Sequence, residues 1–104
     1  MSIRYYSTNR AQREIGLVEA LLLGQARDRG LFMPERFPDL GADELQSLRG
    51  RPYADVAFAV LRKFTAGVFD DDVQRALCDD AYDYDVPLEA VAGRKYLLRL
   101  DRGP

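Results

Sequence analysis

The sequence predicts an α+β fold of about three to four helices and a few short strands. Apolar residues between positions 53 and 64 recur at intervals of three and four, which is the spacing of one helix face. β-Prone runs are short and lie at residues 3–6, 31–33 and 95–101. Because the chain has 104 residues, about the size of one ordinary domain, we expect these helices and strands to share a single core.

The first elements follow from turn and helix signals. The run at residues 3–6 is followed by the turn-forming residues 7–9, so a short strand should end there. Apolar residues within 16–23 recur at helical spacing, and Gly24 is placed to end that helix. The N-terminal quarter therefore predicts a strand, a turn and a short buried helix.

An apolar run is enclosed by a glycine and a proline. Three large apolar residues, 31–33, stand between Gly30 and Pro34 in a stretch otherwise rich in arginine and acid. We expect Gly30 to permit a close turn, and Pro34, which has no N–H, to break the strand ladder. The run thus predicts a brief strand whose side chains, pointing to both sides, anchor the small domain.

The central part of the chain predicts further helices. Residues 43–49 begin with acidic side chains and carry apolar residues on one side, which is typical of a short helix. Pro52 can set the first turn of the strongly periodic segment 53–64. Acidic residues 70–72 precede another periodic segment. Since negative charge is favoured at the positive end of a helix dipole, these residues predict the start of a third substantial helix.

The C-terminal part predicts a connection and then a strand. Residues 79–93 are acidic and contain a proline and a glycine, so we interpret them as a connection. Apolar side chains in the run 95–101 point to both faces, as in a mostly buried strand. Since few other strands are predicted, we expect its lateral partners to belong to polypeptide beyond Pro104.

Composition and charge exclude several classes of function. The formal net charge is −2 and the pI is about 5.1, so no basic surface for nucleic acid is expected. No apolar run approaches the roughly 18–20 residues of a membrane span. The single cysteine, Cys78, cannot form an intramolecular disulfide, and the chain has no histidine for acid–base or metal chemistry. With no signal peptide at its start, the sequence predicts a cytoplasmic protein without nucleic-acid or membrane partners.

Several stretches resemble, in order, the N-terminal region of bacterial threonine synthases. YYST at residues 5–8 matches the opening of that family. ALLLGQ at 20–25 is similar to the family's ALLxGL, and ARDRGLFMPERFP at 26–38 is similar to its APDGGLYMPExIP. The sequence departs at Gln25, where the family usually has leucine, and at Arg29, where it often has glycine.

The resemblance continues to the end of the chain and implies an enzyme that uses pyridoxal 5′-phosphate (PLP). YADVAFAVLRKF at residues 53–64 is similar to a helix of the family. YLLRLDRGP at 96–104 resembles the LELFHGP stretch that precedes Thr-x-x-Phe-Lys-Asp, whose lysine forms a Schiff base with PLP. Members convert O-phospho-L-homoserine and water to L-threonine and phosphate, and here that lysine would lie beyond Pro104.

On this resemblance, residues 1–82 form the small N-terminal domain of a threonine synthase. Residues 83–104 are then a connection and the first strand of a truncated α/β PLP-binding domain. We expect no catalytic, cofactor-binding or metal-binding residue in this stretch, no bound PLP and no activity of this chain alone. The implied partners are the rest of its own chain and, as small-molecule substrate, O-phospho-L-homoserine.

Two other functions are compatible with the same residues. One alternative is a free-standing, non-enzymatic interaction domain that shares the helix pattern. The other is a threonine-synthase-like phospholyase that acts on a different substrate.

Single residues that could carry chemistry each have an ordinary structural interpretation. Lys63 lies off the apolar face of its helix and Lys95 precedes the last strand, so we expect both on the surface rather than bound to PLP. Cys78 is expected to be a small buried hydrophobe, not a reactive thiol. Tyr5 and Tyr6 are expected to pack in a strand rather than contact substrate.

Two groups of charged residues have similar interpretations. The acidic group lacks the glycine-containing loop and closing glutamate of an EF-hand, so it predicts a solvated connection and not a cation site: Asp79, Asp80, Asp83 and Asp85. The arginines around the apolar run could hold an anion such as the substrate phosphate, but they alternate with acidic residues and predict an ordinary charged surface: Arg27, Arg29 and Arg36.

Overall fold

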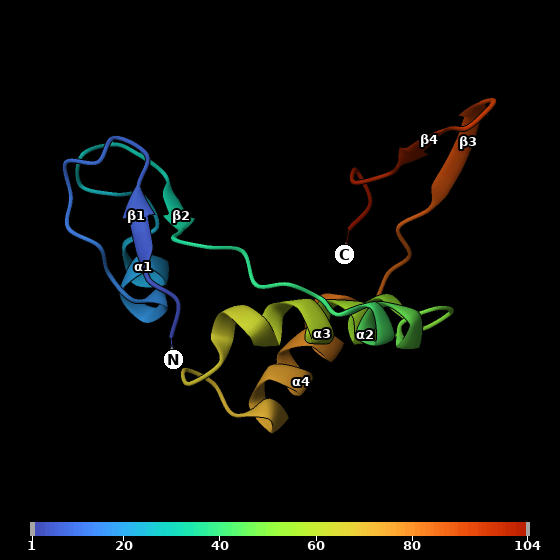
Figure 1. The fold of residues 1–104 in the computed structure, drawn as a ribbon, viewed down its shortest axis with the longest axis horizontal. Helices are drawn as coiled ribbons and strands as arrows, with labels where there is room; N and C mark the ends of the chain where they lie inside the picture. Colours follow the sequence, from blue (N-terminus) through green and yellow to red (C-terminus); the bar gives the residue numbers. More distant parts are fainter. Residues whose placement is uncertain (1, 104) are drawn as a thin grey trace.

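The computed structural model describes residues 2–103 as four helices and two small antiparallel sheets (Figure 1). The α+β class is therefore confirmed. The elements in chain order are β1 (Tyr5–Ser7), α1 (Leu17–Leu23), β2 (Phe32–Pro34), α2 (Ala42–Ser47), α3 (Tyr53–Thr65), α4 (Asp71–Ala81), β3 (Leu88–Ala92) and β4 (Lys95–Leu98).

The first lobe contains β1, β2 and α1 and holds the best-buried core. β1 and β2 pair antiparallel, with Ser7 opposite Phe32, and Tyr5 also exchanges two backbone hydrogen bonds with Ile15. The buried cluster consists of Ile3, Tyr5, Ile15 and Ala20. Phe64 from α3 packs against this cluster, so the lobe is joined to the helices through apolar contact.

Two expectations about the apolar run at 31–33 are wrong. Pro34 does not break the ladder, because it pairs with Tyr5 inside the sheet and the Glu35 N–H still donates to the Arg4 carbonyl at 2.8 Å. Tyr5 directs its own N–H and carbonyl toward Ile15, so Pro34 occupies a non-hydrogen-bonded position that requires no donor. Leu31 is 64% exposed, and only the neighbouring Phe32 packs against the core.

The helices α3 and α4 pack against each other and lie below the first lobe and to its right in Figure 1. Their inner faces bury Ala57 and Thr65 of α3 and Gln74 and Cys78 of α4. The short helix α2 precedes them as predicted. No helix in the part of the chain described here combines the length and the apolar character needed to cross a bilayer.

The segment predicted to be a connection contains a strand, so that prediction is wrong for residues 88–92. β3 and β4 form a hairpin in which Leu88 lies opposite Leu98, with a register shift between Ala90 and Ala92. Gly93 has φ +53° and forms part of the turn. The sequence pattern associates Gly93 with a loop, but in the structure this glycine lies in the turn that joins two strands.

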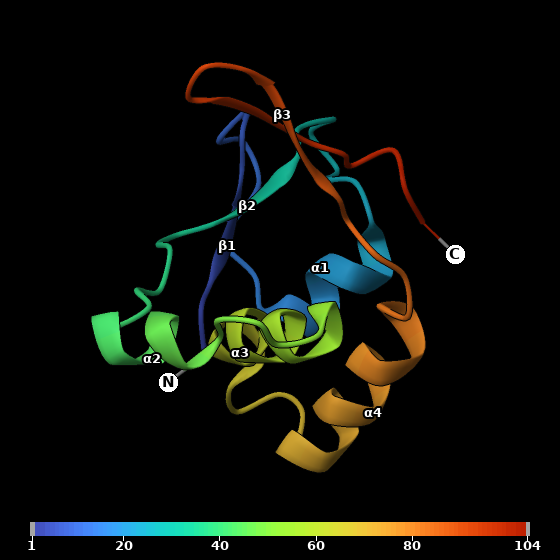
Figure 2. The ribbon, with the colours of Figure 1, turned by 90° about the vertical axis from the view of Figure 1, so that its right-hand side faces the viewer.

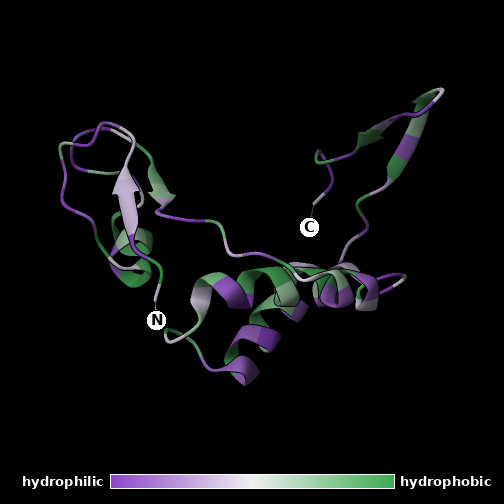
Figure 3. Ribbon diagram, viewed as in Figure 1, coloured by the Kyte–Doolittle hydropathy of each residue, from purple (hydrophilic) through white to green (hydrophobic). Residues whose placement is uncertain are grey.

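The last strand is also not buried, contrary to prediction. Every residue of β3 and β4 is exposed, and one lateral partner of β4 is β3 of the same chain. Figures 1 and 2 show the hairpin extending away from the helices. Figure 3 shows that its strands nevertheless carry hydrophobic residues. Its polar stabilisation comes from Arg99, which pairs with Glu89 at 2.9 Å and Asp101 at 2.8 Å.

Candidate functional site

An aspartate carboxylate joins the loop that follows β1 to the loop that precedes β2. The Ser7 hydroxyl donates to Asp28 Oδ1 at 2.5 Å, and the Gly30 N–H donates to the same oxygen at 2.9 Å. The Ala11 N–H donates to Asp28 Oδ2 at 3.0 Å. We call this contact between residues 7–12 and 26–31 the loop lock. Hydrogen bonds to an ionised acceptor are stronger than neutral ones, so the carboxylate is the centre of the contact.

The same contacts lower the pKa of the Asp28 carboxyl below its ordinary value. The Ser7 hydroxyl is the largest cause, and the backbone N–H groups of Gly30, Ala11 and Gln12 act in the same direction. Partial burial opposes them. Since an acid–base catalyst needs a pKa near the working pH, Asp28 is suited to be a permanently ionised acceptor and not a proton carrier.

Further hydrogen bonds connect the two loops around this carboxylate. The Asn9 N–H donates to Ser7 Oγ at 3.2 Å, and Asn9 Nδ2 donates to the Asp28 carbonyl at 2.9 Å. The Leu31 N–H donates to Thr8 Oγ1 at 2.9 Å, and the Thr8 N–H donates to the Leu31 carbonyl at 2.9 Å. The two loops are thus joined by hydrogen bonds from both backbone and side-chain groups.

Gly30 is required by close packing and not by its own backbone angles. A Cβ atom at this position would lie 2.1 Å from Ser7 Oγ, 2.9 Å from Thr8 Oγ1 and 3.0 Å from the Asn9 nitrogen. The left-handed residue of the turn is Arg29, with φ +71°. This is the position at which the resembling family often has glycine, because glycine adopts such an angle without strain.

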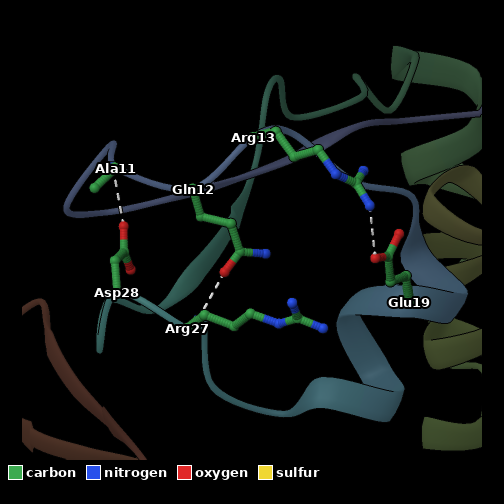
Figure 4. A pocket seen from close by; sticks show the side chains of 6 residues that line it. All are labelled: Ala11, Gln12, Arg13, Glu19, Arg27 and Asp28. Carbon is green, nitrogen blue, oxygen red and sulfur yellow. Dashed lines mark hydrogen bonds and ion pairs between the residues drawn. The ribbon is translucent and has the colours of Figure 1, made fainter.

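A pocket of about 420 Å³ lies beside the loop lock (Figure 4). Arg13 pairs with Glu19 at 2.9 Å on one side, and the Arg27 N–H donates to Gln12 Oε1 at 2.6 Å on the other. Asp28 completes the charged lining. These side chains provide positive and negative charges together with hydrogen-bond donors and acceptors. The lining contains no serine, cysteine or lysine nucleophile.

Of the arginines singled out in the sequence, the structure brings only one to this pocket. Arg27 lines it, whereas Arg36 is exposed elsewhere and Arg29 offers its carbonyl to Gln25 Nε2 at 3.0 Å. Arg27 shares the pocket with Glu19 and with Asp28. Arg27 therefore lies beside acidic groups in this pocket.

The lysines, the cysteine and the tyrosines take ordinary positions. Lys63 Nζ pairs with Glu44 Oε2 at 3.0 Å, and Lys95 is exposed on β4. Cys78 is 1% exposed, as expected of a small buried hydrophobe. Tyr5 belongs to the core, and the ring of Tyr6 lies under the Arg10 guanidinium, 3.9 Å from the ring centroid.

The acidic residues near the end of α4 do not converge. Asp79 pairs with Arg75 at 2.9 Å, while Asp80, Asp83 and Asp85 are exposed. Among residues 2–103 the structure shows no group of three or more acidic, cysteine or histidine side chains that could hold a metal ion. A solvated acidic surface agrees with this arrangement.

An apolar groove of about 520 Å³ separates the first lobe from the helix pair. Tyr5, Leu17 and Leu21 line it from one side, and Phe64 and Leu77 line it from the other. The polar side chains of Thr65 and Gln74 also line it. Gln74 is 4% exposed, its Nε2 lies 3.5 Å from Cys78 Sγ, and its Oε1 accepts no hydrogen bond from the described residues.

The sequence reading missed both the loop lock and Gln74. A signal for the lock was present, because an aspartate two residues before a glycine is a typical Asx turn, in which the carboxylate accepts the N–H two residues later. No local signal links Asp28 to Ser7, which lies 21 positions away. For Gln74, only the packing of α4 against α3 reveals its burial.

Comparison with known proteins gives consistent results over the whole chain. Residues 4–82 match the family model described as threonine synthase N terminus. Threonine synthase of Pseudomonas aeruginosa is 36% identical over 98% of this chain, and that of Methylobacillus glycogenes is 34% identical over 98%. The chain spans 23% and 24% of these two relatives, about a quarter of their length.

A solved structure agrees in fold as well as in sequence. The crystal structure of PLP-bound threonine synthase from Brucella melitensis superimposes with a TM-score of 0.83 and 35% identity, covering 99% of this chain and 23% of the other. Both stretches of the loop lock, residues 7–12 and 26–31, lie within the matched family region. This chain belongs to the threonine synthase N-terminal family.

Proposed function

We propose that this chain is the N-terminal part of a PLP-dependent threonine synthase, a lyase that converts O-phospho-L-homoserine and water to L-threonine and phosphate. The observation that carries the proposal is the similarity to the PLP-bound Brucella enzyme, which extends over 99% of this chain at 35% identity. The chain corresponds to only 23% of that enzyme, so most of the catalyst is supplied by the remaining polypeptide.

The residues described here do not fit PLP itself. A Schiff base requires a lysine with a free amine inside a shaped cavity. Lys63 is held by Glu44, and Lys95 is exposed on the hairpin. We therefore place the PLP lysine beyond Pro104 and assign no catalytic or cofactor-binding residue to this stretch.

The division at residue 82 remains part of the proposal. α4 ends at Ala81, and the rings of Tyr82 and Tyr84 pack on Tyr53, with centroids 5.0 and 5.6 Å away. We assign residues 1–82 to the N-terminal domain and 83–104 to the connection and the first strand of the PLP-binding domain.

With one buried cysteine and no disulfide, the reducing cytoplasm is the compartment we propose.

The test uses the full-length protein encoded by the gene. We expect it to show the absorbance band of a PLP Schiff base and to release phosphate and form threonine from O-phospho-L-homoserine. The 104-residue chain should do neither. Activity of the short chain would contradict the assignment of the lysine.

Parallel assays with other phosphorylated amino alcohols distinguish the remaining alternatives. Turnover of one of these in place of O-phospho-L-homoserine would indicate a phospholyase with a different substrate. A full-length product without PLP and without activity toward any of them would indicate a non-enzymatic interaction domain.

A further inference from the structure

The molecule exposes far more surface than a compact protein of its size. Its accessible surface is 7884 Å², whereas a compact monomer of 11.8 kDa exposes about 5,900 Å². Its radius of gyration is 16.2 Å, compared with about 13 Å for a compact domain of this length. A specific interface typically covers about 800 Å² on each partner, so the excess is enough for more than one such contact.

Part of this excess surface area lines the apolar groove between α1 and α4. Three large side chains that line it are half or more exposed: Leu21 at 62%, Phe37 at 69% and Leu77 at 50%. Large contiguous apolar surfaces of this kind mark contact sites for other protein segments. Phe64, which lines one side of the groove, packs directly on the cluster of Ile3, Tyr5, Ile15 and Ala20.

Gln74 adds chemical detail to the groove. It is nine-tenths or more buried, it lines the groove, and its Oε1 has no hydrogen-bond donor among residues 2–103. A buried acceptor without a partner is costly, and native proteins rarely leave one unsatisfied. An occupant of the groove that brings an N–H or O–H to Gln74 Oε1 would remove this cost.

We propose that the groove receives an apolar segment of the same polypeptide from beyond residue 104, which donates a hydrogen bond to Gln74 Oε1. This rests on the proposed function, because the Brucella enzyme and the curated relatives contain about four times as much chain as is described here. The groove is then the interface through which the N-terminal domain is fixed to the catalytic part.

Thiol labelling of the full-length protein tests whether the groove is covered. In Leu21→Cys the new thiol lies in the groove, and in the control Leu22→Cys it lies on the same helix at a position that is 83% exposed and does not line the groove. Between Arg13 and Arg27 the sequence has no other cysteine, so both are read from one tryptic peptide.

We expect the Leu21→Cys thiol to react with a maleimide at least about tenfold more slowly in the native protein than after unfolding. The Leu22→Cys thiol should react within about threefold of its unfolded rate, and protection at both positions would support a wider contact. Reaction of Leu21→Cys at its unfolded rate would overturn the proposal.

Photo-crosslinking identifies the occupant. With p-benzoylphenylalanine in place of Phe37, irradiation of the full-length protein should join this position to a peptide from beyond residue 104 at the mass of one chain. A crosslink confined to residues 1–104, or a product of twice the mass, would overturn the choice of occupant.

Gln74→Leu gives a test in which the sign of the effect decides. If Oε1 stays unpartnered in the full-length protein, replacing the amide with an apolar group of similar size raises the melting temperature. If an occupant donates to it, the substitution leaves that donor unsatisfied and lowers the melting temperature, which is our expectation.

These readouts do not depend on catalysis. Protection of Leu21→Cys in a full-length protein without threonine synthase activity would support the groove and contradict the proposed function. An active enzyme with an unprotected Leu21→Cys thiol would do the reverse.

Discussion

The loop lock and the β3–β4 hairpin are stabilised in opposite ways. In the lock, Ser7 is fully buried and Asp28 accepts hydrogen bonds from a hydroxyl and two backbone N–H groups. In the hairpin, every strand residue is exposed although several are large and apolar. The lock is therefore complete within the described residues, whereas the hairpin, like any isolated two-stranded sheet, has little burial to support it.

This difference indicates which parts of the molecule depend on their surroundings. Polar groups in the lock find their partners within one short region, so their contribution needs nothing further. Apolar side chains gain free energy only when another surface removes them from water. Substitutions in the lock should thus have large effects in this chain, and substitutions in the hairpin should have small ones.

The largest effect is expected for Gly30→Ala. The added Cβ would meet Ser7 Oγ at 2.1 Å and the Asn9 backbone at 3.0 Å, so the two loops must separate. Overpacking at such a site costs about 3 kcal/mol of the free energy of unfolding, which denaturant titration measures. Gly16→Ala is the control, because nothing lies within 4 Å of its Cβ and its φ is −81°. An equal loss in both variants would contradict the packing argument.

A smaller effect with a defined pH dependence is expected for Ser7→Ala. Removing the hydroxyl removes the main cause that lowers the pKa of Asp28, so this pKa should rise toward its ordinary value. A carboxyl with a lowered folded-state pKa adds stability that is present above the unfolded pKa, about 3.9, and is lost as the pH falls through the folded value.

Ser7→Ala should therefore be destabilising at neutral pH and lose most of its effect in acid, where Asp28 is protonated in both proteins. NMR titration of the Asp28 carboxyl together with thermal unfolding at both pH values measures this. A destabilisation that does not change with pH would indicate that Ser7 acts through packing alone.

The smallest effect is expected for Leu98→Ser in the hairpin. Leu98 is 52% exposed, so the substitution should change the free energy of unfolding of this chain by less than about 0.5 kcal/mol. The apolar residues on both faces of 95–101 predict burial. Burial by the remaining polypeptide would make the same substitution cost about 2 kcal/mol or more in the full-length protein. Equal effects in the two proteins would contradict that prediction.

Strong local patterns were sufficient to predict most elements. The periodicity of 53–64 predicted α3, and the acidic residues 70–72 marked the start of α4. β3 was not predicted, because residues 79–93 combine acidic residues, a proline and a glycine, and strand pairing across Gly93 cannot be read from them. The position of Pro34 inside the sheet depends on the long-range pairing of Tyr5 with Ile15.

The α+β class, the family resemblance and the exposed position of Lys95 could be predicted from the sequence alone. These depend on short-range patterns and residue types, which act locally along the chain. Three other features are visible only in the folded chain: the contact of Asp28 with Ser7, the burial of Gln74 without a donor among residues 2–103, and the exposure of the hairpin. Each of these depends on which distant segments come together, and apolar periodicity indicates that a face will be covered without specifying what covers it.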